Sequence, residues 1–317
     1  MIGFGDRRYP GRPLRWSPNR CAGFVLALVA LVALALAVPR LAPPAHAAAD
    51  GVLAKIESEG VIRAGTRASA PPFARKLETG GFEGFSVDLL EAIRASAEEK
   101  VGRPVTLELQ EVTPGDRLER VAAGELDIVC GITTPTWDRE ALVDFSVPFF
   151  RDGTRILIYR EKAAGGVDLG TLDIGVVEDT TTVEIVKDQL PTANLHLYPS
   201  MQDAMSALAA GEVSGVANIG ITLLGLAAKA VPRRSVVLLP RTFALAMETL
   251  ACVLPQDDSP WRDVVNRVLV DIFSGVKDSN SRYDEIYERW FGRNSEIFYP
   301  LDRANRNYLS TVSIWAR

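Results

Sequence analysis

Two adjacent hydroxyl residues, Thr181 and Thr182, stand between a short apolar run at 174–177 and a segment with the apolar spacing of a helix. Thr181 is followed three residues later by Glu184, a capping-box pattern that marks the start of a helix. The first turn of a helix has free backbone N–H groups and the positive end of the helix dipole, so it favours an anion. The sequence therefore predicts an anion contact at this helix start.

Arginine is the side chain best suited to complete such a site. Its planar guanidinium donates two parallel, charge-assisted hydrogen bonds to a carboxylate, which a lysine cannot reproduce. The chain has 35 Lys and Arg against 40 Asp and Glu; outside residues 1–47, which hold six arginines and one aspartate, the counts are 29 and 39. So acidic a chain lacks the basic face that nucleic-acid binding needs. We expect no nucleic-acid partner, and a bound anion must be held by a local cluster of arginines.

Residues 1–47 have the features of an export signal. A stretch with five arginines precedes the uncharged apolar run Cys21–Val38, and the small residues Ala45 and Ala47 follow at the distance of a signal-peptidase site. This order predicts a cleavable secretory signal and a periplasmic location. The alternative is an uncleaved anchor, because a run of 18 uncharged residues is just long enough to span a bilayer.

Beyond residue 60, short apolar or β-branched runs alternate with helical segments, which predicts βαβ units and an α/β fold. Expected helices cover 87–97, 117–123, 181–190 and 200–211, and a long amphipathic helical segment covers 260–292. The expected strands are 61–64, 105–109, 126–130, 155–159, 174–177, 195–198 and 213–216.

Two consecutive βαβ blocks meet near 150–153 and again near 239–248. Two crossings of this kind make a hinge between lobes. We therefore predict a discontinuous first lobe of residues 48–152 and 247–317, and a second lobe of residues 153–246.

Four segments resemble family 3 of the bacterial extracellular solute-binding proteins: Gly84–Asp88, Leu126–Gly131, Val143–Phe150 and Tyr287–Gly292. They occur in the family's order, and the resemblance extends over roughly 51–292. It implies a two-lobed periplasmic-binding-protein fold of type II. Each lobe would have a mostly parallel sheet flanked by helices, with the ligand cleft between the lobes.

Within this family the chain is most similar to the glutamate/aspartate-binding branch. The segment Cys130–Thr134 reads Cys-Gly-x-Thr-Thr and is followed by Arg139 at the branch's spacing, and Cys252 matches the branch's second cysteine. Spacing alone leaves a disulfide and two buried free thiols equally open. The resemblance favours a disulfide between Cys130 and Cys252.

The same resemblance implies a role for each candidate ligand-binding residue. Arg139 would bind the ligand's α-carboxylate from the first lobe, with Thr133 and Thr134 beside it. Thr181 and Thr182 would hold the same carboxylate from the second lobe, which would couple binding to closure of the cleft. Arg67 and Arg117 would bind a second, distal carboxylate.

The chain departs from the family pattern on one side of the expected pocket. Asn218 stands after the run 213–216, where amino-acid binders of this family place an aspartate for the ligand's ammonium. Ile132 and Met201 replace polar side chains of the glutamate/aspartate branch. An ammonium buried without a carboxylate loses a charge-assisted hydrogen bond. The ligand is then either a dicarboxylate without an amino group or an amino acid whose ammonium meets Asn218 and water.

Further aromatic side chains are candidates for the cleft wall. Phe73 could contact the aliphatic part of a ligand, and Trp137 is either a cleft-lining aromatic or one packed against a loop. His196 has no partner at metal-ligand spacing, so we expect no metal and no cofactor.

Taken together, these features predict the substrate-binding component of an ABC importer that captures an acidic amino acid by cleft closure. Its partners would be a small carboxylate ligand and the importer's permease, and it would act as a monomer. The resembling fold also includes a periplasmic cyclohexadienyl dehydratase, which makes catalysis the alternative. Because no catalytic motif or paired acids stand out, we predict that the protein is not an enzyme.

Overall fold

A computed structural model describes residues 51–230 and 235–315 of the chain. Residues Asp50–Arg317 form one compact unit. The predicted signal segment, residues 1–47, lies outside the described residues. Within the described ranges, no helix has both the length and the apolarity needed to cross a membrane.

The first lobe contains a five-stranded sheet with the strand order β5-β1-β6-β14-β7. Strand β1 pairs in parallel with β5 and β6, whereas β14 is antiparallel to β6 and β7. The strands are β1 (Val61–Thr66), β5 (Thr106–Glu111), β6 (Ile128–Val129), β7 (Asp144–Phe145) and β14 (Val253–Leu254). A small three-stranded sheet, β2 (Ser69–Ala70), β3 (Ala74–Lys76) and β4 (Phe82–Glu83), lies between β1 and the next helix.

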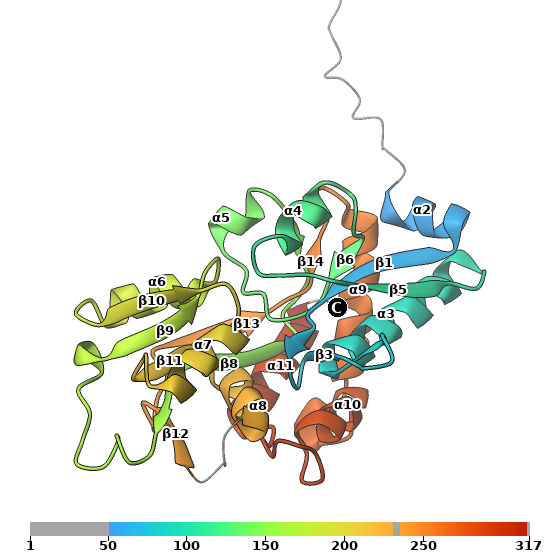
Figure 1. Cartoon of the computed structure of the whole chain (residues 1–317). Coiled ribbons are helices and arrows are strands. Elements are labelled where there is room, and N and C mark those ends of the chain that lie inside the picture. Colours follow the sequence, from blue (N-terminus) through green and yellow to red (C-terminus); the bar gives the residue numbers. More distant parts are fainter. Residues whose placement is uncertain (1–50, 231–234, 316–317) are drawn as a thin grey trace, which may run out of the picture. The chain divides into compact units, whose positions relative to one another are not determined.

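Helices cover both faces of this first sheet (Figure 1). Adjacent residues of β6 point to opposite faces, so Ile128 joins the large core and Val129 joins a smaller one beneath α4. The large core contains the aromatic side chains Phe85, Trp261 and Tyr283. The helices of this lobe are α2 (Val52–Glu59), α3 (Phe85–Val101), α4 (Arg117–Ala122), α5 (Trp137–Glu140), α9 (Ser259–Phe273), α10 (Arg282–Phe291) and α11 (Arg303–Trp315).

The second lobe contains a sheet with the order β10-β9-β11-β8-β12, and β13 also pairs with β8. Strand β9 is parallel to β10 and β11, but β8 is antiparallel to all three of its partners. Both sheets are therefore mixed, not mostly parallel as predicted, because β14 in the first sheet and β8 in the second run against their neighbours. The strands are β8 (Phe150–Tyr159), β9 (Asp173–Val177), β10 (Asn194–Tyr198), β11 (Gly215–Ile219), β12 (Val236–Leu239) and β13 (Ala246–Leu250).

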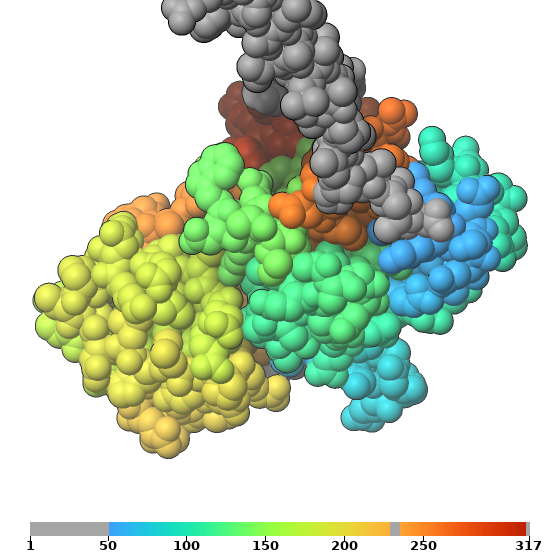
Figure 2. All heavy atoms as spheres, turned by 90° about the horizontal axis from the view of Figure 1, so that it is seen from above, coloured from blue at the N-terminus to red at the C-terminus, as the bar shows by residue number. Residues whose placement is uncertain are grey.

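This second sheet also has a core on each face. Leu157 packs with α7 (Met201–Ala210) and α8 (Gly220–Ala230), while Ile156 and Ile158 pack with α6 (Thr181–Gln189) on the other side. The fold is thus α/β with two sheet-containing lobes. In Figure 2 the α6–α8 region (yellow) and the β1–α4 region (blue to green) occupy different parts of the surface.

Strands β8 and β13 carry the chain between the lobes and pair with each other. Gly153 lies opposite Met247, and Asp152 lies opposite Glu248. The predicted lobe boundaries, at 152/153 and 246/247, fall on these register positions. The exact boundaries stay a prediction.

The segment 260–292 is not one continuous helix. Helix α9 ends at Phe273, and Gly275 has a φ of 86°, in the left-handed region that favours glycine. A short 3-10 turn, Val276–Asp278, follows, and Ser281 and Asp284 then form a capping box that starts α10.

Candidate ligand-binding site

A cavity lies where elements of the two lobes meet. It contains seven of the eight predicted ligand-binding residues; the eighth, Thr133, lies behind its wall. The lining residues are Arg67, Ser69, Ala70, Pro114, Arg117, Ile132, Thr134, Arg139, Val177, Thr180, Thr181, Thr182, Met201, Asn218, Ile219 and Thr222.

Arg117, the first residue of α4, is only 3% exposed. Its Nε donates to Thr133 Oγ1 at 2.9 Å, and its Nη1 donates to the Pro114 carbonyl. Thr133 therefore does not line the cavity but orients an arginine that does.

Arg139 belongs to α5, whose first turn is capped by Thr136. Its Nη1 donates to the Thr134 carbonyl at 2.7 Å, and its Nη2 donates at 3.3 Å to the carbonyl of Asp179, just before α6. Arg139 thus reaches from one lobe to the other. Arg67, directly after β1, lines the cavity, and its side chain has no hydrogen bond within the described part of the chain.

These three arginines concentrate positive charge in a cavity with no acidic residue in its lining. Burial lowers the pKa of Arg67 and of Arg139. Burial, followed by repulsion from Arg139 and Arg67, lowers the pKa of Arg117 to about 9. None of the three forms an ion pair with a described residue. An anion in the cavity would relieve this unfavourable accumulation of charge.

The N-terminus of helix α6 lies at the same cavity. Its N-cap is Thr180, and Thr180, Thr181 and Thr182 all line the cavity. The predicted capping box at Thr181 is wrong, because the Thr181 hydroxyl donates to Glu248 Oε2 at 2.5 Å. The Thr180 hydroxyl instead donates to the Val177 carbonyl at 2.6 Å.

Other parts of the lining are less polar. Ile132 and Met201 place apolar groups there, and the hydroxyl of Thr222 on α8 is buried without a hydrogen-bond partner among the described residues. Asn218, at the end of β11, accepts the Ile219 N–H through its own Oδ1 at 2.8 Å. The backbone uses one of the two lone pairs of this oxygen, and a contact between Asn218 and a ligand ammonium stays a prediction.

The two candidate aromatic walls lie elsewhere. Phe73 is 1% exposed and packs edge-on against Phe85 and Phe150 in the first-lobe core. Trp137 is 87% exposed and does not line the cavity. The prediction that Phe73 lines the cleft was wrong, because its ring packs in the core. Neither alternative for Trp137 is found, because its side chain remains at the surface.

Glu248 is the residue that sequence reasoning missed. It is 5% exposed, lies on β13 and accepts hydrogen bonds from three threonines: Thr134 in the loop after β6, Thr154 on β8 and Thr181 on α6. The available signal was a single acid inside the otherwise apolar run 244–254. A buried carboxylate in such a run must have partners, because its desolvation is otherwise costly.

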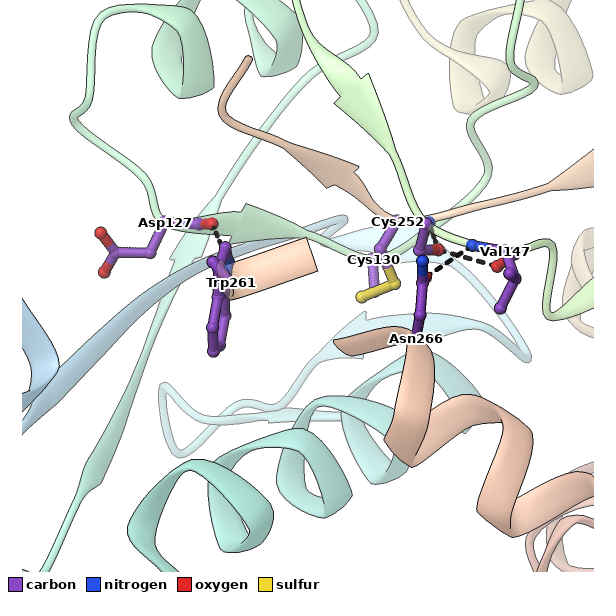
Figure 3. Close-up of a disulfide and its surroundings, with 7 residues drawn as sticks. Asp127, Cys130, Val147, Cys252, Trp261 and Asn266 are labelled. Atoms are coloured by element: carbon purple, nitrogen blue, oxygen red, sulfur yellow. Dashed lines mark hydrogen bonds between the residues drawn. A yellow bond between two sulfur atoms is a disulfide. The ribbon is translucent and has the colours of Figure 1, made fainter. Parts of the chain in front are cut away.

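Cys130 and Cys252 form the predicted disulfide beside this site (Figure 3). The segments it joins are also held by the backbone, since Ala251 N–H donates to the Thr133 carbonyl at 3.1 Å. Around the bridge, Trp261 Nε1 donates to the Asp127 carbonyl at 2.9 Å. The disulfide therefore fixes the loop from which Thr133 and Thr134 project.

This combination of two lobes and a cationic cavity between them defines a solute-binding protein. Consistent with that class, the profile of the bacterial extracellular solute-binding proteins, family 3, matches residues 62–293, and the chain belongs to this family. No group of three or more His, Cys, Asp or Glu side chains within 51–230 and 235–315 could hold a metal ion.

Two relatives illustrate the range of named ligands. The L-glutamate/L-aspartate-binding protein of Pseudomonas aeruginosa is 27% identical over 273 residues, which cover 83% of this chain and 85% of that protein. The glutamine-binding protein of Geobacillus stearothermophilus is 28% identical over 183 residues, covering 57% of this chain and 69% of that protein.

Among solved structures, an ancestral amino acid-binding protein described as a precursor of cyclohexadienyl dehydratase is similar. It has a TM-score of 0.64 and 25% identity, and the match covers 76% of this chain and 99% of that one. The similar proteins named here are thus amino-acid binders, with glutamate/aspartate and glutamine among their ligands.

Proposed function

We propose that this protein is the substrate-binding component of an ABC importer and captures an acidic amino acid of the glutamate/aspartate type. The observation that carries the proposal is the set of three arginines, Arg67, Arg117 and Arg139, around one cavity without an acidic lining residue. A dicarboxylate neutralises more of this charge than a neutral amino acid such as glutamine does. The glutamate/aspartate-binding relative that aligns with most of the chain supports the same ligand class.

In this proposal the ligand's α-carboxylate binds Arg139 and the free backbone N–H groups in the first turn of α6, at Thr181 and Thr182. The distal carboxylate binds Arg67 and Arg117, and Thr133 holds Arg117 in place. The first-lobe and second-lobe contacts close residues 48–152 and 247–317 onto residues 153–246. Closure is favoured by the ligand because each lobe alone offers only part of the contacts.

The protein would act in the periplasm after export through its predicted N-terminal signal, and would deliver its ligand to the importer's permease. It would be a monomer without cofactor. Binding is favoured over catalysis because no carboxyl group lines the cavity to serve as a general acid or base. The similar ancestral structure is itself named as an amino acid-binding protein.

A non-amino dicarboxylate is the second candidate, and Asn218 is the observation that favours it. The Asn218 Oδ1 accepts the Ile219 N–H, and its NH₂ group is a donor that a residue lining the cavity can offer to a ligand. A carboxylate or keto oxygen suits such a donor better than an ammonium does.

A thermal-shift screen of the purified protein tests the proposal. It would include L-glutamate, L-aspartate, L-glutamine, 2-oxoglutarate, succinate, malate and neutral amino acids. A ligand that binds only the native state raises the unfolding temperature in proportion to the logarithm of its excess. A shift with glutamate or aspartate supports the proposal, and a shift confined to amine-free diacids moves the assignment to dicarboxylates. A shift only with neutral amino acids, or none at all, contradicts it.

A further inference from the structure

We propose that Glu248, acting with the hydroxyls of Thr134 and Thr181, forms the seat for the ligand's ammonium group. This inference rests on the proposed function and deepens it, because it assigns the residue that makes the site select an amino acid. Glu248 would supply the negative charge that Asn218 does not.

The geometry of Glu248 is set by three hydroxyl donors. Thr134 Oγ1 donates to Glu248 Oε2 at 2.8 Å, and Thr181 Oγ1 donates to the same oxygen at 2.5 Å. Thr154 donates to the other oxygen, Oε1. Thr134 comes from the first lobe, Thr154 from β8 and Thr181 from the start of α6, so the carboxylate joins both lobes.

These bonds decide what the two cavity-lining threonines can offer a ligand. A hydroxyl has one proton to donate and two lone pairs to accept with. The hydroxyls of Thr134 and Thr181 both donate their proton to the Glu248 carboxylate. Only their lone pairs therefore remain to bind a group in the cavity. Two acceptors backed by a buried negative charge form a site for a cation with several N–H donors, such as an ammonium.

The position of Glu248 relative to Arg139 matches an α-amino acid. Arg139 Nη1 donates to the Thr134 carbonyl at 2.7 Å, while the Thr134 hydroxyl contacts Glu248. Glu248 also acts electrostatically on Arg139, since its charge opposes the lowering of the Arg139 pKa by burial. A cation and an anion thus flank one threonine. The carboxylate and ammonium of an α-amino acid, attached to a single carbon, require just such adjacent and opposite charges.

Substitution of Glu248 by glutamine tests this role, because the amide keeps the size of the side chain and removes its charge. The amide NH₂ can also donate to the threonine hydroxyls, which would turn their protons toward the cavity. Calorimetry would compare L-glutamate with glutarate, and L-aspartate with succinate, because each diacid lacks only the amino group. We expect Glu248→Gln to lower the affinity for the amino acid about 10- to 100-fold. The affinity for the matching diacid should fall by less than about threefold.

The matched control is Glu184→Gln, which changes the net charge equally at an exposed position on α6. We expect the affinity of this variant for both ligands to stay within about twofold of the wild-type value, because exposed charges are screened. Equal weakening of amino acid and diacid by Glu248→Gln would overturn the inference and leave a purely structural role. An unchanged preference for the amino acid would also overturn it. A wild-type protein that binds neither member of either pair would instead refute the proposed function, and the inference with it.

Discussion

Tyr299 donates a hydrogen bond of 2.8 Å to Asp152. The tyrosine lies in the C-terminal segment after α10, and the aspartate lies on β8, the strand that leaves the first lobe. Asp152 also accepts the Ile221 N–H of α8 at 2.8 Å. The C-terminal segment is therefore hydrogen-bonded to the strand that connects the lobes. The carboxylate of Asp152 that accepts this bond also contacts the second lobe.

Removing the Tyr299 hydroxyl should destabilise the protein modestly. We expect Tyr299→Phe to lower the free energy of unfolding by about 1–2 kcal/mol, because Asp152 is buried and loses one of its donors. Urea unfolding of the two proteins would measure this. Tyr198→Phe is the control, because the Tyr198 hydroxyl has no hydrogen bond within the described residues. Equal losses in the two variants would show that the Tyr299–Asp152 bond contributes nothing specific.

The grouping of the three arginines could be expected from the sequence, because it follows from topology. Arg67 follows β1, Arg117 begins α4 after β5, and Arg139 follows the loop after β6. These strands are parallel neighbours, so the segments after them meet at one edge of the sheet. Local apolar patterns define such strands, and the family's motifs then indicate which arginines to choose.

Glu248 could not be placed in the same way. Its role depends on the antiparallel pairing of β13 with β8, which are separated by most of the second lobe in sequence. No local pattern encodes that register. The division of 260–292 into α9 and α10 was missed for a different reason: amphipathic spacing continues across the break, while Gly275 and the Ser281 cap interrupt the backbone.

Arg139 should be needed as an arginine and not merely as a cation. We expect Arg139→Lys to weaken L-glutamate binding about 10- to 100-fold, because an ammonium cannot form two parallel bonds to a carboxylate and also hold the Thr134 carbonyl. Calorimetry at fixed ionic strength would measure the change. Arg282→Lys, at an exposed position of α10, should leave the affinity unchanged. A similar affinity in Arg139→Lys and wild type would remove Arg139 from the carboxylate contact.

Ligand affinity should depend on pH through Arg117. Its pKa of about 9 is lowered by burial and by Arg139 and Arg67, so a bound dianion should raise it again. The free protein therefore loses this proton above about pH 9 and must regain it to bind. We expect the Kd for glutarate, which has no ammonium to titrate, to be constant between about pH 7 and 8 and to rise by up to about tenfold per pH unit above 9. A constant Kd up to about pH 10.5 would mean that Arg117 stays charged throughout.

The disulfide should stabilise the first lobe. It closes a sequence separation of 122 residues, and both cysteines are fully buried. We expect Cys130→Ala combined with Cys252→Ala to lower the free energy of unfolding by about 3–5 kcal/mol, measured with guanidinium chloride. Reductant should destabilise the wild type and leave the double variant unchanged. Equal sensitivity of both proteins to reductant would contradict a role for this bridge.

Gly225 should be required for the close contact between α8 and the loop after β2. A Cβ at this position would lie 2.1 Å from the Pro71 carbonyl oxygen, which is backbone and cannot simply rotate away. Within a helix, alanine is otherwise favoured over glycine by about 1 kcal/mol. We expect the clash in Gly225→Ala to outweigh that preference and to lower the unfolding temperature. The affinity for L-glutamate should fall about tenfold, because α8 also carries Thr222, which lines the cavity. Ser206→Ala on the exposed face of α7 tests helix propensity alone and should not destabilise the protein. If Gly225→Ala is as stable as Ser206→Ala and binds like wild type, α8 does not need this close approach for closure.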